Sequence, residues 1–129
     1  MIASMFAVMA GGALGCLMRW GLGLGLNRFF PAVPPGTLVA NYIGAYLIGL
    51  SMAYFGAHPE LSPQWRLLVI TGFLGGLTTF SSFSGEVVLL LQQGRVGVAC
   101  AAISAHVIGS LVLTVAGMAT VMAARATWP

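Results

Sequence analysis

The sequence predicts an all-α integral membrane protein, with four transmembrane helices in each subunit and a third helix that is broken mid-membrane. Hydrophobic residues make up 59% of the 129-residue chain, charged residues only 5%, and the mean hydropathy is +0.99. In soluble domains roughly a quarter of the residues are charged. The apolar residues fall into four segments long enough to cross a bilayer. Nucleic-acid binding is excluded, because the five arginines are scattered and no cationic patch forms.

The first predicted helix covers about residues 3–26, and the connection after it is polar or proline-rich, with Asn27, Arg28, Pro31 and Pro34. The segment lacks the positive N-terminal region of a secretion signal and continues past Arg19. We therefore expect it to be retained as a membrane helix. Cys16 and Cys100 lie in apolar segments, where we expect buried thiols and no disulfide.

The second predicted helix covers residues 35–55, with a proline in its first turn, where the missing N–H costs nothing. The fourth covers residues 96–124, after the turn at Gly94 and Arg95. Both helices carry polar residues one turn apart: Thr37 and Asn41 on the second, and His106, Ser110 and Thr114 on the fourth. We expect His106 to be a hydrogen-bonded core residue, because no further ligand stands at metal-binding spacing.

The third predicted helix covers residues 63–93, with Ser62 as its N-cap and Pro63 in its first turn. A straight helix of this length measures roughly 45 Å, against a hydrocarbon core of about 30 Å. Glycines at 72, 75 and 76 predict a break near 75–79, which would leave the carbonyls of Gly75 and Thr78 free to bind a cation. The alternative is a continuous tilted helix whose glycines serve close packing.

The segment after the predicted break carries hydroxyl and ring side chains that indicate an ion path. Asn41 is costly in lipid and needs an interhelical or pore partner. Glu86 is the acidic residue inside a predicted helix, and it is either functional, a partner for Arg19 or a residue at a wet vestibule. The candidate pore residues are Thr37, Asn41, Phe80, Ser81, Ser82, Phe83, Glu86, Ser110 and Thr114, with Arg19 at a vestibule.

The arginines indicate how the subunit inserts and assembles. If the four helices alternate in direction, one side of the membrane receives Arg66 and Arg125, and the other receives Arg28 and Arg95, with Arg19 near it. The positive-inside rule needs an excess on one side, so this chain has almost no preferred orientation. Small residues at four-residue spacing predict close helix packing in a subunit too small to enclose a wide aqueous pore by itself. An antiparallel homodimer is the simplest closed assembly.

Three blocks of the chain stand out as motifs: GGALGCLMRW at 11–20, GTLVANYIGAYLIG at 36–49 and GFLGGLTTFSSF at 72–83. Together they resemble the Fluc (CrcB) family of small fluoride channels. The resemblance covers essentially the whole chain in order, and the third block is highly specific. The family commonly has a threonine where this chain has Ser82, so the hydroxyl is kept and a methyl is lost.

The resemblance implies a passive fluoride channel in the bacterial inner membrane, formed by an antiparallel dual-topology homodimer with two narrow pores. It also implies a structural sodium ion on the dimer axis, held by the backbone carbonyls of Gly75 and Thr78. Phe80 and Phe83 would be the pore phenylalanines, and Asn41 the pore amide. Membrane lipid would surround the assembly.

Fluoride is small and tightly hydrated, so a pore must replace its water with amide, hydroxyl and positively polarised ring-edge donors. A small multidrug-resistance-type, proton-coupled cation exporter is the alternative function, but such proteins resemble one another in a glutamate in the first helix, which is lacking here. A nonconducting assembly subunit is a third reading. An enzyme is not expected, because nothing indicates an oxyanion hole or a substrate cleft.

Overall fold

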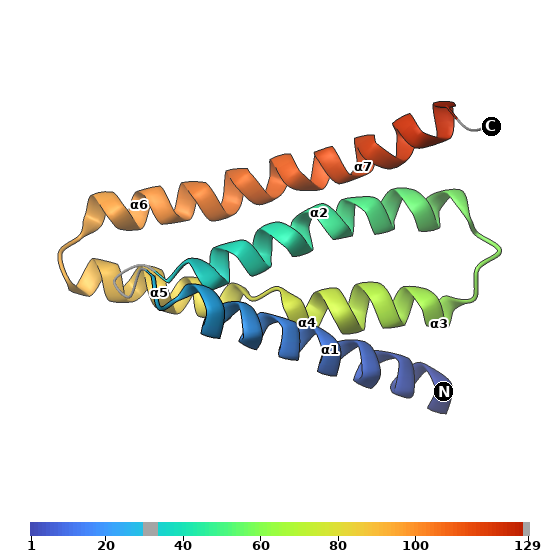
Figure 1. Ribbon diagram of the computed structural model, residues 1–129, viewed down its shortest axis with the longest axis horizontal. Helices are drawn as coiled ribbons and strands as arrows, with labels where there is room; N and C mark the ends of the chain where they lie inside the picture. The colour runs from blue at the N-terminus through green and yellow to red at the C-terminus, as the bar shows by residue number, and fades with distance from the viewer. Residues whose placement is uncertain (30–33, 128–129) are drawn as a thin grey trace.

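The chain folds into long helices that run back and forth along one axis (Figure 1). The structure is a computed structural model that describes residues 1–29 and 34–127; Pro31 of the predicted connection lies outside the described residues. Helix α1 (Ile2–Leu26) forms the first span and α2 (Pro35–Ala57) the second. In the described residues four spans are long and apolar enough to cross a membrane. The prediction of an all-α multi-pass membrane protein is confirmed.

The third and fourth spans are each built from several segments. The third contains α3 (Pro63–Arg66), the π-helical η1 (Leu67–Leu74), α4 (Gly75–Leu77) and α5 (Phe80–Gln92). The fourth contains α6 (Val96–Ser104), the π-helical η2 (Ala105–Gly109) and α7 (Ser110–Thr127). Short π-helical stretches often occur near functional sites, and η2 carries His106.

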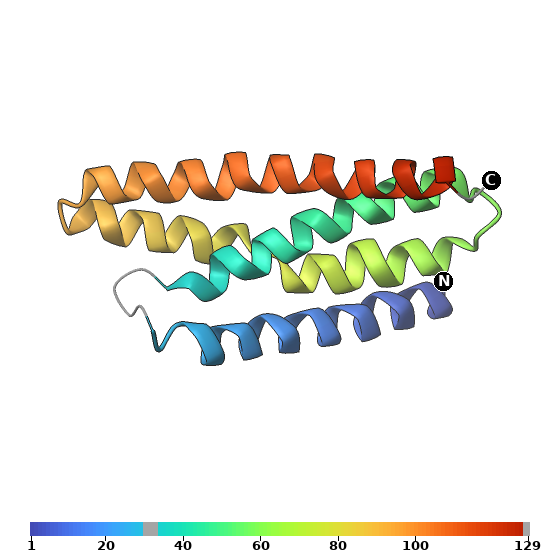
Figure 2. The same cartoon turned by 45° about the horizontal axis from the view of Figure 1, so that its top comes forward.

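The start of α1, the end of α7 and the α2–α3 connection lie at one end of the molecule, and the α5–α6 connection lies at the other (Figures 1 and 2). Helix α1 packs along η1 and α4, while α2 packs along α7. Arg66, in α3, and Arg125, in the last turn of α7, are therefore at the same end, opposite Arg95. This is the sidedness expected for helices that alternate in direction.

Glycines bring α1 and the third span close together. A Cβ atom at Gly11 would overlap the carbonyl of Leu68, and one at Gly15 would overlap the carbonyl of Phe73. From the other side, a Cβ at Gly72 would come 2.8 Å from the Val8 carbonyl oxygen, and one at Gly76 would come 2.6 Å from the Gly12 carbonyl oxygen. Gly72 and Gly76, two of the glycines used to predict a break, therefore serve close packing.

The backbone of the third span leaves helical geometry at two threonines. Thr78 has φ −83° and ψ 155°, and Thr79 has φ −152° and ψ 116°, both extended conformations. Gly75–Leu77 are helical and Phe80 starts the next helix. The non-helical stretch is thus confined to residues 78 and 79, and it begins later than the predicted 75–79 because the glycines themselves remain in helical segments.

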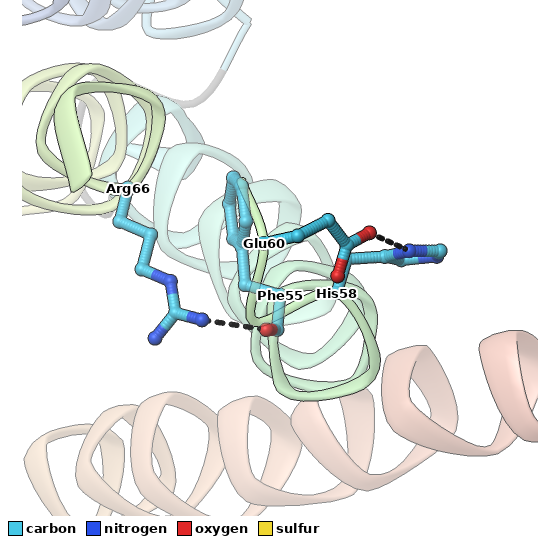
Figure 3. Close-up of polar contacts among 4 residues, drawn as sticks. All are labelled: Phe55, His58, Glu60 and Arg66. Carbon is cyan, nitrogen blue, oxygen red and sulfur yellow. Dashed lines mark hydrogen bonds and ion pairs between the residues drawn. The ribbon is translucent and has the colours of Figure 1, made fainter. Parts of the chain in front are cut away.

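Arg66 ties the end of α2 to the start of the third span (Figure 3). Its Nη2 donates to the Phe55 carbonyl at 2.7 Å, and its guanidinium lies 5.7 Å from the centre of the Phe55 ring. Ser62 occupies the predicted N-cap position, but its side chain makes no capping hydrogen bond. In the connecting loop, a backbone hydrogen bond and then the hydrogen bond with His58 (2.9 Å) hold the pKa of Glu60 below its ordinary value.

Candidate functional site

The extended stretch of the third span is held by the side-chain amide of Asn41, which comes from α2. The backbone N–H of Thr79 donates to Asn41 Oδ1 at 2.8 Å, and Asn41 Nδ2 donates to the Thr79 carbonyl at 3.1 Å. Asn41 thus occupies both backbone groups of one residue, as a neighbouring β-strand would. A freed backbone group inside a membrane must find a partner. This pair of bonds therefore permits the interruption of the third span, by which we mean the non-helical residues Thr78 and Thr79.

The side chain of Thr79 starts the next helix. Its Oγ1 accepts a hydrogen bond from the Ser82 backbone N–H at 3.1 Å, which is the standard N-cap interaction. The same oxygen lies 3.1 Å from Ser81 Oγ and 3.2 Å from Ser82 Oγ. Ser84 Oγ donates to the Ser81 carbonyl at 3.0 Å. Thr79 Oγ1 therefore lies at the centre of a small cluster of hydroxyl groups.

Two carbonyls lose their usual helical donors at this point. In a continuous α-helix the N–H of residue 79 would donate to the Gly75 carbonyl, and that of residue 82 to the Thr78 carbonyl. Here the first N–H donates to Asn41 and the second to Thr79 Oγ1. Gly75 is exposed and Thr78 half-buried, so both carbonyls lie near an accessible surface. In the described residues no group of three His, Cys, Asp or Glu side chains could hold a metal ion.

Five of the predicted pore residues line one cleft of about 480 Å³ that also borders the interruption. They are Asn41, Phe80, Phe83, Ser110 and Thr114, and Gly75, Thr78, Thr79 and His106 line the same cleft. The hydroxyl of Thr114 lies within hydrogen-bond distance of two carbonyls, those of Ser110 (2.9 Å) and Ala45 (3.1 Å). That hydroxyl therefore joins the fourth span to the second.

The two phenylalanines meet edge to face but lie in different surroundings. Their ring centres are 5.4 Å apart at an interplanar angle of 68°. Phe80 is 77% exposed in the single chain, whereas Phe83 is 7% exposed and packs with Val87, Leu90 and Ala99. The ring of Phe83 also lies 4.4 Å from that of His106, at an angle of 31°.

A second cleft, of about 570 Å³, is lined by Arg19 together with Thr37, Thr79 and Ser82. Arg19 Nε donates to the Gly76 carbonyl at 3.0 Å, which holds the guanidinium beside the third span. Cys16 lines this cleft and is exposed, as is Cys100, so the expectation of buried thiols is wrong for the single chain.

Glu86 is paired with Thr37, and it is not paired with Arg19. Thr37 Oγ1 donates to Glu86 Oε1 at 2.5 Å, and this contact joins the first turn of α2 to α5. Glu86 lines a third cleft, of about 540 Å³, together with Gln93 and His106. The alternative in which Glu86 serves as the partner of Arg19 is therefore not observed.

Sequence reasoning missed Thr79 as a site residue and left His106 outside the site. A threonine directly before a resumed apolar helix is an N-cap signal that could have identified Thr79. The expectation that His106 is a hydrogen-bonded core residue is confirmed, since it is 8% exposed and its Nδ1 lies 3.2 Å from Asn41 Nδ2. No local pattern indicates that contact, because it joins residues far apart in the chain.

These features define a multi-pass α-helical membrane protein that holds a polar site within its membrane-spanning part. The chain belongs to the CrcB family: the family described as "CrcB-like protein, Camphor Resistance (CrcB)" matches residues 6–118.

Relatives cover almost the whole chain. A protein of Pseudomonas putida (strain W619) is 60% identical over 120 residues, which are 93% of this chain and 94% of that protein. A protein of Tolumonas auensis is 61% identical over 120 residues, with the same coverage. A protein of Paraburkholderia phymatum is 55% identical over 121 residues, or 94% of this chain and 96% of that protein. Each is named "Fluoride-specific ion channel FluC".

Proposed function

We propose that this chain is the subunit of a fluoride-selective channel, not an enzyme, that lets fluoride leave the cell passively. The observation that carries this proposal is the 60% identity, over 93% of the chain, to a relative named as a fluoride-specific channel. The geometry supports it, because the amide, hydroxyl and ring groups expected to replace the water around fluoride gather at one membrane-spanning site. As a passive channel in the bacterial inner membrane, the protein would dissipate a fluoride gradient.

The proposed working unit is an antiparallel homodimer. The cleft beside the extended residues opens at the surface of the single chain, and Phe80 at its edge is 77% exposed. A narrow, selective pore needs that face covered, and a twofold-related copy would supply the same donors from the other side. Two symmetric pores would follow from such an arrangement.

The broken third helix is proposed to hold a structural sodium ion on the axis of this dimer. Unwound backbone carbonyls are typical sodium ligands in membrane proteins. The carbonyls of Gly75 and Thr78 fit this chemistry, because their helical donors are directed elsewhere. Two oxygens are too few to coordinate a sodium ion, so a second copy would be needed to complete the coordination. Sodium bound there would give the site a positive charge that favours an anion nearby.

The proposed fluoride path runs beside Phe80 and Phe83 and along the hydroxyls of Ser81, Ser82, Ser110 and Thr114. Asn41, Thr37 and Glu86 are proposed to contribute at the same path, with Arg19 at the vestibule. Both clefts that border Thr79 contain groups from this set, which supports one continuous polar route past the interruption. Asn41 would contribute there by holding the extended backbone of Thr79 beside the path.

Liposome flux tests the proposal directly. Purified protein in vesicles loaded with potassium fluoride should release fluoride once a potassium ionophore is added, with no coupling to protons. Vesicles loaded with chloride should release far less. Equal rates for the two anions would contradict selectivity, and proton-coupled export of a cation would favour the exporter. A dependence of flux on sodium, with lithium or potassium as the control, would test the bound cation separately.

A further inference from the structure

His106 is the buried histidine of the fourth span, and it lies at the polar site beside Asn41. It is 8% exposed and lies in η2, with its Nδ1 3.2 Å from Asn41 Nδ2. Its ring lies 4.4 Å from the ring of Phe83. His106 therefore contacts both the amide that holds the interruption and a predicted pore ring.

The orientation of the Asn41 amide follows from its contacts with Thr79. A backbone N–H can only donate, so the Asn41 atom 2.8 Å from the Thr79 nitrogen must be the carbonyl oxygen Oδ1. The other atom is then Nδ2, which lies 3.1 Å from the Thr79 carbonyl. This arrangement satisfies both backbone groups of Thr79. A flipped amide would instead set its NH2 group against the Thr79 N–H, and its oxygen against the Thr79 carbonyl.

The protonation of His106 follows in turn. Asn41 Nδ2 lies 3.2 Å from His106 Nδ1, and an amide nitrogen can only donate. Nδ1 must therefore carry a lone pair, so the ring is neutral with its proton on Nε2. A charged ring, or the opposite tautomer, would bring an N–H of the ring against an N–H of the amide.

We propose that His106 is a positioning residue: in its neutral, Nε2-protonated form it accepts the second Nδ2 hydrogen of Asn41 and so locks the amide that holds Thr79 extended. The inference rests on the proposed channel function for its effect on ion flux, and on geometry alone for the tautomer. Without this acceptor, one amide hydrogen would be left unpaired at a half-buried position, which costs stability. The amide would then be free to turn away from Thr79.

The first test is spectroscopic and uses the full chain in liposomes. Histidines labelled with ¹⁵N are observed by solid-state NMR, and His58→Gln removes the signals of the exposed loop histidine. We expect His106 Nδ1 to give the signal of an unprotonated, hydrogen-bonded ring nitrogen, and Nε2 to give that of an N–H. A protonated Nδ1 would overturn the proposal, and this result does not depend on whether the protein conducts fluoride.

The second test uses three substitutions of His106, chosen so that each keeps or removes the hydrogen-bond acceptor or the ring. His106→Asn places an amide oxygen at the position of Nδ1 and keeps an acceptor. His106→Leu has similar branching without an acceptor, and His106→Phe keeps a ring against Phe83 without an acceptor.

Fluoride efflux should fall about tenfold in the Leu and Phe variants and only about two- to threefold in the Asn variant, as expected when one hydrogen bond is lost or kept. Thermal unfolding and dimer assembly are measured on the same samples. Flux that is kept by Phe and lost with Asn would show that only the ring matters, and would overturn the proposal. If the unsubstituted protein passes no fluoride, the channel function fails, and the NMR result still decides the tautomer. If a variant does not fold, the NMR spectrum of the protein that retains His106 still tests the proposal.

Discussion

At the scale of single residues, Phe80 and Phe83 differ in what surrounds them although their rings touch. Phe80 is exposed in the single chain, whereas Phe83 is buried against the fourth span. A substitution at Phe80 therefore tests the pore with little effect on the subunit core. A substitution at Phe83 changes the core and the pore together.

We predict that Phe80→Ile lowers fluoride efflux at least about tenfold while changing subunit stability by less than about 0.5 kcal/mol. The physical reason is that isoleucine keeps the apolar volume but lacks the polarised ring edge. The control, Phe83→Ile, should lose flux and also about 1 kcal/mol of stability through changed packing. Efflux from liposomes and thermal unfolding of the same samples are the measurements. Full transport through Phe80→Ile would contradict a ring-edge role.

Thr79 gives a second residue-scale prediction, because its hydroxyl caps α5 through the Ser82 N–H. Thr79→Val keeps the shape and removes the cap, which should cost about 1 kcal/mol of stability and lower fluoride flux. Thr79→Ser keeps the oxygen and should resemble the unsubstituted protein in both measurements. Thermal unfolding and fluoride efflux are measured in parallel for the two variants and for the unsubstituted protein. Equal behaviour of the two variants would show that the cap does not hold the interruption.

At the scale of helices, α1 and the third span approach through glycine, and the chain offers a matched control for this contact. A Cβ at Gly15 would overlap the Phe73 carbonyl and lie 2.7 Å from the Leu77 nitrogen. A Cβ at Gly85, on α5, would meet no atom within 4 Å. The same change from glycine to alanine therefore has opposite consequences at the two positions.

We predict that Gly15→Ala destabilises the subunit by about 1–3 kcal/mol, because backbone atoms of the third span cannot move aside without repacking. Gly85→Ala should be neutral or stabilising by up to about 1 kcal/mol, since alanine favours helix more than glycine does. Thermal unfolding in detergent gives both values. A Gly15→Ala protein as stable as Gly85→Ala would mean that the two spans are not packed this closely.

The helix ends could be predicted from the sequence because local signals mark them. Pro35 and Pro63 begin their spans, and Gly94 has a positive φ of 72° at the turn before α6. The interruption could be predicted only in outline, since its place is set by Asn41, a residue of another helix. Gly76 was misleading for the same reason, because the surface it packs against belongs to α1.

The residue types of the candidate site could be predicted from the sequence, but which of these residues bond to one another could not. Hydroxyl, amide and ring residues inside apolar helices are unusual enough to be recognised from the chain alone. Which of them bond to one another depends on how the spans are rotated and shifted. The contact between Thr37 and Glu86, and that between Asn41 and His106, each join two spans that no local pattern aligns.

At the scale of the whole molecule, the single chain exposes large apolar side chains along most of its length. Phe6, Trp20, Leu111 and Val115 are each at least 60% exposed, on the first and fourth spans. Lipid or a second subunit must cover such surfaces. The ends of the molecule carry few charges: Arg66 in α3 and Arg125 in α7 are at one end, and Arg28, which follows α1, and Arg95, which precedes α6, are at the other. Neither end therefore has the excess of positive charge that would fix its side of the membrane.

We predict that this balance lets one gene product insert in both orientations, and that a small added charge upsets it. About three lysines appended after the C-terminus should keep that end in the cytoplasm and lower fluoride flux per protein molecule, because antiparallel pairs become rare. Three appended glutamines are the control and should change neither quantity. Labelling of single introduced cysteines from each side of the membrane, in a background lacking Cys16 and Cys100, measures orientation.

Co-expression then distinguishes a loss of antiparallel pairing from a loss of activity caused by the appended lysine tail itself. A copy with Gln92→Lys and Gln93→Lys adds positive charge at the α5–α6 end, and alone it should be biased the other way and conduct poorly. Expressed together, the two biased copies should recover most of the flux, since each supplies the orientation that the other lacks. Flux that stays low in the mixture, or unmodified protein labelled from one side alone, would contradict the antiparallel assembly. Recovery in the mixture cannot arise from a channel whose subunits all face one way, because the two copies would then compete for a single orientation.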